Sequence, residues 1–214
     1  MSSSGPALWP SPPARTRAVT ASGIASSEAG GVSGVVLAAD LRSTGGRPSA
    51  LTTDREGPWL PRAVNTLLAA GCDPVFVVLG AASDEAAELV PPDPRVRTIV
   101  SGDWQRGQSH SLRTGLRMAA ITRSRGLLLT RVELPNLHAS AVHRIVDGAD
   151  EGTLRRAVYD DRPGYPVFIG REHWTELRLG LTGDAGAHGF LEQHDGEDVD
   201  CSDLGDGAAP GADA

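Results

Sequence analysis

Short apolar runs alternate with helix-like spacing through the middle of this chain. The run at residues 34–39 is continuously apolar and predicts a strand buried on both faces, and further strands are predicted at 75–80, 96–100 and 126–130. Between and after them, apolar residues at helical spacing predict helices from Leu60 to a stop at Gly71 and at 83–90, 109–120 and 139–146. Strands that alternate with helices in this way predict βαβ units around a parallel sheet.

The pattern changes after residue 150. Two strands are predicted at Leu154–Tyr159 and Val167–Gly170, joined by a loop over 160–165, and a helix follows through Trp174 and Leu177. Two neighbouring strands with a short connection favour an antiparallel pair. The predicted fold class is therefore α/β, with a mostly parallel sheet, flanking helices and a small antiparallel excursion.

Both ends of the chain have a composition that cannot bury a core. Residues 1–31 are rich in Ser, Pro, Ala and Gly, and they are predicted to form a disordered tail. The acidic, glycine-rich segment 196–214 is predicted to be mostly mobile, with nothing to bury past Leu204. One domain is thus expected over 32–204, followed by a flexible tail at 205–214.

Composition narrows the chemistry. All 20 basic residues are arginine, so any role that elsewhere needs a lysine amine requires an arginine here. The net charge of -7 argues against nucleic acid or an anionic membrane as the main partner, although a local arginine cluster could still hold a phosphate. The two cysteines lie far apart and predict reduced, structural thiols. Without a signal peptide or a long apolar segment, a cytoplasmic location is predicted.

Ligands of open α/β sheets collect at the carboxyl ends of the strands. After the first predicted strand comes the polar loop Asp40–Ser49, which contains Arg42, Arg47 and the pair Gly45-Gly46. Glycine amides and arginine side chains favour a phosphate cradle. An ordinary flexible loop explains the same residues, because the loop matches neither standard phosphate-binding motif.

The segment after the third predicted strand enters a helix with small polar residues. Ser109, Ser111 and Arg113 lie at or near its start, where a base or phosphate would meet helix amides. The alternative is plain N-capping of the helix by Ser109. A hydrolase constellation of Asp103, Ser109 and His110 has little support, because the chain has no G-x-S-x-G elbow.

Glu133 follows the fourth predicted strand. A carboxylate at this edge could ligate Mg²⁺ together with substrate phosphates, although a solvated loop residue is the alternative. The remaining candidates for metal ligands lack the spacing of metal motifs, and surface or packing roles are expected for His138, His143, His173, His188 and His194.

Taken together, these segments resemble the MobA-like nucleotidyltransferases, and within them the molybdenum cofactor cytidylyltransferase branch. The resemblance runs over about 32–204, and it is carried by residues 35–39, 68–81, 103–104, 111–116, 162–167 and 183–187. It implies a Rossmann-like nucleotide-binding domain. It also implies transfer of a nucleoside monophosphate from a triphosphate, CTP favoured, to a phosphorylated, molybdopterin-like acceptor with Mg²⁺.

The resemblance also assigns roles to residues. It implies that Arg42 or Arg47 replaces the family's lysine and that Glu133 holds the metal. Nucleotide contacts are implied at Leu37, Ala38, Ala39, Gly45, Gly46, Ser109, Ser111 and Arg113. No nucleic acid or membrane partner is expected, while a pterin-type small molecule and a protein partner both stay open.

Several positions depart from the family's pattern where its chemistry occurs. Asp40 replaces the first glycine of the loop, Thr44 its arginine and Ser49 its lysine, while Arg131 adds a cation beside Glu133. The place assigned to the second metal carboxylate, in a C-terminal D-[IV]-D-T-P motif, reads residues 209–212 and holds no acid. Two hypotheses follow: a divergent active enzyme, or a non-catalytic relative that binds a nucleotide, another ligand or a protein.

Overall fold

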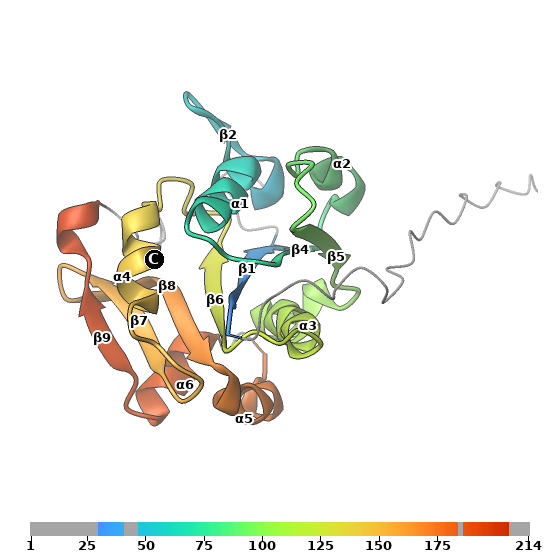
Figure 1. Ribbon diagram of the computed structural model, residues 1–214. Helices are drawn as coiled ribbons and strands as arrows, with labels where there is room; N and C mark the ends of the chain where they lie inside the picture. Colours follow the sequence, from blue (N-terminus) through green and yellow to red (C-terminus); the bar gives the residue numbers. More distant parts are fainter. Residues whose placement is uncertain (1–29, 41–46, 184–185, 206–214) are drawn as a thin grey trace, which may run out of the picture.

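A seven-stranded sheet organises the part of the chain that the computed structural model describes, residues 30–40, 47–183 and 186–205 (Figure 1). Its strand order is β5-β4-β1-β6-β8-β7-β9, and within it only β8 runs antiparallel to its neighbours. The predicted α/β class, mostly parallel with an antiparallel excursion, is confirmed. The strands are β1 (Val32–Ala38), β4 (Val75–Leu79), β5 (Val96–Val100), β6 (Gly126–Arg131), β7 (Leu154–Tyr159), β8 (Arg162–Gly170) and β9 (Glu197–Asp200).

Helices cover both faces of this sheet. α1 and α4 pack on one face, whereas α3, α5 and α6 pack on the other (Figure 1). α2 lies near the end of β4. The helices are α1 (Trp59–Ala69), α2 (Ser83–Glu88), α3 (Gln108–Ala120), α4 (Ala139–Val146), α5 (Trp174–Gly180) and α6 (Ala187–Gln193). Most of the two predicted tails, residues 1–29 and 206–214, lies outside the described residues.

The central strands form because their residues are apolar on both faces. Every residue of β4 is buried, and so are six of the seven in β1. α1 ends before Gly71, whose φ of 84° is the left-handed conformation that favours glycine after a helix. A methyl group at Gly115 would come within 2.9 Å of Val35 Cγ1, so this glycine lets α3 pack closely against β1.

The predicted loop over 160–165 is wrong, because β8 already begins at Arg162. The turn consists of Asp160 and Asp161 alone, with φ of 49° and 61°. Aspartate tolerates the left-handed conformation, which is the one a two-residue hairpin turn needs. Pro163 lies in the first residues of β8 and hid the strand in the sequence, since proline is normally a signal against one.

The prediction that 196–214 is mostly mobile is wrong for its first residues. β9 adds a seventh strand in parallel with β7, and the amide of Cys201 continues the pairing by donating to Val158 O at 2.9 Å. Cys201 itself is fully buried. Acidic residues dominate β9, so its sequence carries no apolar pattern that would indicate a strand.

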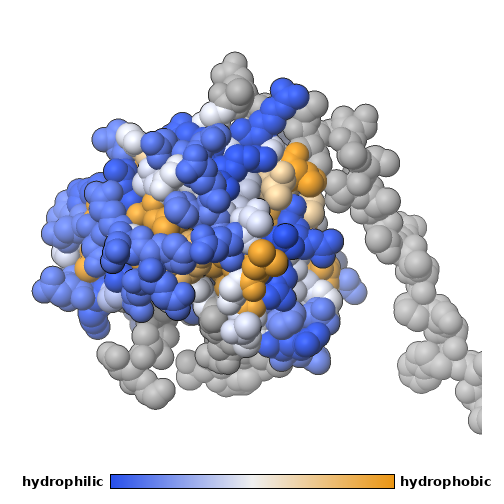
Figure 2. All heavy atoms as spheres, turned by 90° about the horizontal axis from the view of Figure 1, so that it is seen from below, coloured by the Kyte–Doolittle hydropathy of each residue, from blue (hydrophilic) through white to orange (hydrophobic). Residues whose placement is uncertain are grey.

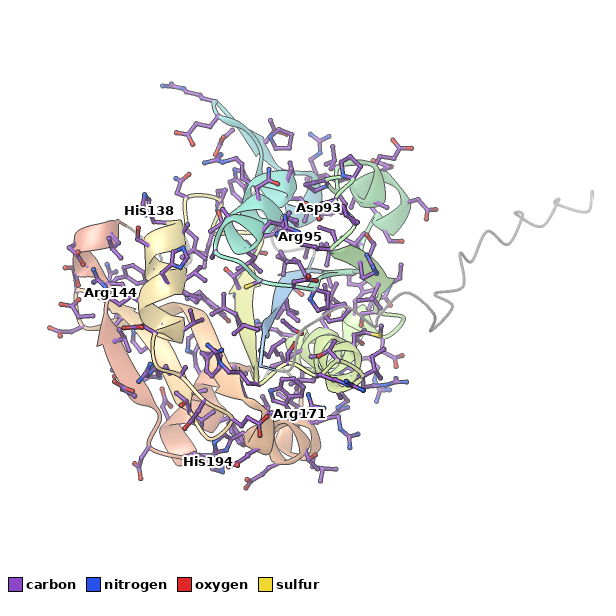
Figure 3. The ribbon with its side chains drawn as sticks, in the orientation of Figure 1. Asp93, Arg95, His138, Arg144, Arg171 and His194 are labelled. Atoms are coloured by element: carbon purple, nitrogen blue, oxygen red, sulfur yellow. The ribbon has the colours of Figure 1, made fainter. Side chains whose placement is uncertain are left out.

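Ion pairs hold β9 to β7. Arg155 Nε lies 2.6 Å from Glu197, and Arg156 Nε lies 2.6 Å from Asp198, each directly across from its partner in the strand register. We call these four residues the β7–β9 ladder. Near it, Arg144 of α4 donates to the Asp200 carbonyl at 2.7 Å and so ties the helix to this edge (Figure 3).

A short hairpin of β2 (Thr53–Asp54) and β3 (Gly57–Pro58) precedes α1 and was not predicted. Asp54 accepts a hydrogen bond from Trp59 Nε1 at 2.9 Å and from Arg62 at 2.7 Å, which fixes the hairpin to the helix.

The surface carries few apolar side chains. The face seen from below is mostly hydrophilic, with separate apolar patches (Figure 2). The large apolar side chains that are exposed among the described residues are Val100, Ile121 and Leu179. None of the described helices has the length and apolar content needed to cross a bilayer.

Candidate functional site

The carboxyl ends of β1, β4, β5 and β6 meet at one edge of the sheet. Two of these strands are extended by one backbone hydrogen bond: beyond β6, Val132 N donates to Leu37 O at 3.0 Å, and beyond β5, Ser101 N donates to Leu79 O at 2.8 Å. β1 is the strand from which the chain moves outward in both directions, to β4 and to β6. Such a switch point is where open α/β sheets bind ligands.

Gly80 brings three parts of this edge together. A methyl group there would lie 2.6 Å from the Ala39 carbonyl oxygen and 2.7 Å from Trp104 Cγ. Trp104 is half-buried in a 3₁₀ turn between β5 and α3. Glycine is therefore required where β1, β4 and the tryptophan ring converge.

The structure places the predicted nucleotide contacts on β1 at this edge. These contacts are Leu37, Ala38 and Ala39. Their side chains are buried, and their backbone groups make hydrogen bonds in the sheet or just beyond its strand ends. The Ala39 carbonyl accepts a hydrogen bond from Ala81 N at 3.2 Å. These residues form the floor of the edge, and their contact with a nucleotide stays a prediction.

The loop after β1 returns to the strand that it leaves. Ser49, which takes the lysine position of the resemblance, is fully buried, and its amide lies 3.3 Å from the Asp40 carbonyl oxygen to which it donates. Arg47 is described and exposed, whereas the predicted residues Arg42 and the pair Gly45-Gly46 lie outside the described residues. Position 49 thus lies at the base of the loop with its side chain buried.

α3 starts at this edge, but not as predicted. It begins at Gln108 after Gly107, whose φ is 112°, and no side chain caps it. N-capping by Ser109 is therefore wrong: Ser109 lies inside the first turn, and its amide donates to Gly183 O at 3.2 Å. The buried Ser111 hydroxyl has no hydrogen-bond partner among the described residues.

Arg113 has a different position from the other predicted contacts. Its guanidinium donates to the carbonyl of Arg178 at 3.3 Å and of Leu181 at 2.5 Å. These bonds join α3 to the end of α5. The structure therefore gives Arg113 an anchoring role, and its predicted contact with a nucleotide remains untested.

Arg131 ends β6 and lies between two carboxylates. Its Nε is 3.3 Å from Glu133 Oε2, and its Nη2 is 3.4 Å from Asp40 Oδ2. We call these three residues the edge triad. Burial lowers the pKa of Arg131, but the electrostatic interactions with Glu133, Tyr165 and Asp40 outweigh it and the pKa is raised overall. The guanidinium is therefore charged at any working pH.

A buried phenol and an imidazole lie next to the triad. Tyr165 lies in β8, which pairs with β6, and burial raises its pKa despite the nearby charge of Arg131 and a hydrogen bond with Gln108. The ring of His188 meets it edge-on, with centroids 4.8 Å apart. Burial, followed by the charge of Arg156, lowers the pKa of His188 to about 4, so the imidazole is neutral at pH 7.

Three of the other histidines in the prediction make structural contacts. His138 accepts a hydrogen bond from Ser140 N at the start of α4, and His194 lies 3.1 Å from Glu176. His173 contacts the Gly152 carbonyl. Within the described ranges, no group of three or more His, Cys, Asp or Glu side chains is placed to hold a metal ion.

Glu133 has one property of a metal ligand and lacks another. Its Oε2 atom is buried and makes no hydrogen bond among the described residues. However, the Arg131 guanidinium lies 3.3 Å from that atom and supplies the positive charge. A divalent cation at Glu133 would have to share the position with a guanidinium, and the two repel one another. The residues present therefore do not fit the metal that the resemblance implies.

A pair of acids was overlooked in the sequence. Asp198-Val199-Asp200 of β9 matches the first three positions of the C-terminal D-[IV]-D-T-P motif more closely than residues 209–212, which lie outside the described residues. The sequence D-V-D itself could have identified this segment as the match to the motif. Both acids are held internally, Asp198 by Arg156 at 2.6 Å and Asp200 by the Ser202 hydroxyl at 2.6 Å.

The fold and this edge define an α/β protein of the nucleotidyltransferase type. The chain belongs to the family of the MobA-like NTP transferase domain, whose model matches residues 34–199. The predicted family is thereby confirmed.

Two relatives add detail. The chain is 32% identical over 182 residues to nicotine blue oxidoreductase of Paenarthrobacter nicotinovorans, covering 80% of this chain and 88% of that protein. It is similar in structure to Rv0371c of Mycobacterium tuberculosis, with a TM-score of 0.67, 24% identity and coverage of 81% and 90%. Rv0371c has also been solved in a complex with manganese, and there the TM-score is 0.64 with 24% identity over 81% of this chain and 88% of that one.

Proposed function

We propose that this protein binds a nucleotide, with CTP as the first candidate, at the carboxyl edge of β1 and holds it without transferring it. Membership of an NTP transferase family and the switch point next to β1 support the nucleotide. A second ligand of the pterin type, or a protein partner, would then meet the bound nucleotide at the same edge.

The observation that carries this proposal is the position of Ser49. Nucleotidyl transfer depends on positive charge placed around the triphosphate as pyrophosphate leaves. Ser49 is uncharged, fully buried and bonded to the backbone of Asp40, so no cation reaches the phosphates from there. Asp40 adds a negative charge at the base of the same loop. Without a cation at position 49 and with this added negative charge, a transition state rich in negative charge is poorly stabilised, which is why we propose binding without transfer.

Active transfer is the competing hypothesis. It requires Arg42 or Arg47 to replace the missing amine and Mg²⁺ to be held by Glu133, with a molybdopterin-like acceptor attacking the α-phosphate. Only Arg47 of these two arginines lies in the described residues, and Arg131 pairs with Glu133. The two hypotheses differ in a product that can be measured, which is pyrophosphate.

The test is a titration of the whole chain with CTP, GTP and ATP, with and without Mg²⁺. Bound nucleotide raises the midpoint of thermal unfolding by mass action. We expect a shift for at least one nucleotide and no release of pyrophosphate. If no nucleotide shifts the unfolding midpoint, the proposal of nucleotide binding is wrong. A shift together with steady release of pyrophosphate would establish active transfer instead.

Asp40→Asn sharpens the same titration. Removing the carboxylate at the base of the loop lowers repulsion of phosphate, so affinity for the triphosphate should rise roughly threefold to tenfold. Asp161→Asn is the matched control, because Asp161 is an exposed acid in the β7–β8 turn. An equal gain in both variants would mean that net charge alone, not the site, sets the affinity.

A second candidate function is reduction of a conjugated heterocycle, which we propose because the relative from Paenarthrobacter nicotinovorans is named nicotine blue oxidoreductase. The observation that favours it here is Tyr165, a buried phenol beside Arg131 whose raised pKa keeps it protonated. A bound nucleotide of the reduced nicotinamide class would give a hydride to the ring. Tyr165 would give the proton and take one back from water, which completes a two-electron reduction.

This second function has its own assay. The chain is mixed with a reduced nicotinamide nucleotide and nicotine blue, and the loss of absorbance of both compounds is followed. Turnover that falls at least about tenfold in Tyr165→Phe would support it, because the phenylalanine keeps the ring and loses the proton. Absence of turnover in the unchanged chain would remove it and leave nucleotide binding without chemistry.

A further inference from the structure

The edge triad has an unusual geometry for an arginine. The Nε–H and one Nη2–H of a guanidinium point from the same edge, which elsewhere grips the two oxygens of one carboxylate. Here Nε meets Glu133 at 3.3 Å and Nη2 meets Asp40 at 3.4 Å. One edge of the guanidinium thus holds a carboxylate from each of two adjacent strand ends.

The register of the sheet makes this meeting unavoidable. β1 and β6 pair in parallel with Leu37 opposite Arg131, so residues just beyond Leu37 and just beyond Arg131 leave the sheet side by side. The side chains are largely shielded from water, with 23% of Asp40, 20% of Arg131 and 11% of Glu133 exposed. Two carboxylates this close and this shielded require a cation between them.

Divalent metals are bound in proteins by such a pair of oxygen ligands together with substrate phosphates. We propose that Arg131 is a resident cation that holds Asp40 and Glu133 in place of a divalent metal, and that the chain therefore takes its ligand without one. The unbonded and buried Oε2 of Glu133 agrees with this, because the oxygen faces a charge and no hydrogen-bond donor of good geometry. Arg131 is in this sense a specificity-determining residue, since it decides between a metal-dependent and a metal-independent site.

The inference rests on the proposed function only for the nature of the ligand. Its test is metal binding without any nucleotide, so a failure of nucleotide binding leaves it standing. Mn²⁺ serves as the probe, because its paramagnetic signal counts free metal directly. The proteins are the full chain, Arg131→Gln, and the matched control Arg155→Gln. The control removes an arginine that is paired with an acid, Glu197, in the β7–β9 ladder.

The full chain and Arg155→Gln should bind Mn²⁺ equally weakly. Arg131→Gln should bind at least about tenfold more tightly, because the two carboxylates then lack their cation. Mn²⁺ should also raise the thermal midpoint of Arg131→Gln and leave that of the full chain unchanged. Adding Glu133→Gln to Arg131→Gln should abolish the gain.

Two outcomes overturn the proposal. One is a folded Arg131→Gln that binds Mn²⁺ no better than the full chain. The other is a full chain that binds Mn²⁺ about tenfold more tightly than Glu133→Gln, because Glu133 would then ligate metal with Arg131 in place. If Arg131→Gln does not fold with or without Mn²⁺, the second comparison decides alone: equal binding by the full chain and Glu133→Gln supports the proposal.

Discussion

The edge triad and the β7–β9 ladder use the same residue types in opposite ways. In the ladder, the ion pairs are short, at 2.6 Å, and their acids are more than half exposed. In the triad, the contacts are 3.3 and 3.4 Å and the acids are mostly buried. The short ion pairs of the ladder thus lie in solvent, where water weakens them. The longer contacts of the triad lie in a shielded position, where an unpaired charge is most costly.

This difference separates a structural role from a functional one. The ladder can be explained by the fold alone, since charges on a sheet edge tie β9 in place and discourage pairing with another sheet. The triad is not the arrangement that stability alone would select, because apolar residues stabilise a buried position as well or better. A shielded charge cluster at the switch point of an open α/β sheet is instead where ligand chemistry is expected.

The largest effect should come from breaking the triad. Arg131→Gln leaves two shielded carboxylates without a cation, so the free energy of unfolding should fall by about 3 kcal/mol. Urea unfolding at pH 7 measures it. A loss below about 1 kcal/mol would mean that water reaches the triad freely and that the comparison with the ladder fails.

A smaller effect on stability is expected from His188, whose pKa depends on charges in both the triad and the ladder. Burial is the main cause of its lowered pKa, and the charges of Arg156 and Arg131 lower the pKa further, whereas those of Glu192 and Asp198 raise it. Between the unfolded pKa of about 6.5 and the folded pKa of about 4, the unfolded chain binds a proton that the folded chain does not, so stability falls as the pH falls.

The corresponding measurement compares the full chain with His188→Gln. From pH 7 to pH 5, the full chain should lose about 1–2 kcal/mol more unfolding free energy than the variant, because only its imidazole titrates in that range. Parallel losses in the two proteins would show that the imidazole is solvated in the folded state.

The smallest effect should come from the ladder. Arg155→Gln removes a pair whose acid is largely in water, and the free energy of unfolding should change by less than about 1 kcal/mol. The change should shrink further in high salt, which screens exposed charges. A loss of unfolding free energy as large as that of Arg131→Gln would show that the ladder stabilises the fold as strongly as the triad does.

Much of the parallel half of the fold could be predicted because burial on both faces leaves continuous apolar runs. β1, β4 and β6 fall on such runs, whereas β5 is an edge strand whose residues are half-buried or exposed. β9 and the first residues of β8 could not be, since acids fill the one and Pro163 interrupts the other. There, pairing with β7 decides the structure, and local sequence does not.

The candidate site shows the same division. Its strand ends could be predicted from the fold class, and Glu133 and Asp40 were both identified as unusual positions. Their meeting at Arg131 could not be, because it depends on the register that puts Leu37 opposite Arg131 and so on which side chains face one another. A charged residue at the very end of an apolar run was the only signal in the sequence.

The nucleotide is expected to bind without a metal. The most direct measurement is calorimetric titration of the full chain with CTP, once with excess Mg²⁺ and once with a chelator. Saturable binding is expected in both conditions, with dissociation constants within about threefold of one another and no pyrophosphate. Binding that needs Mg²⁺, or no binding in either condition, would contradict this expectation.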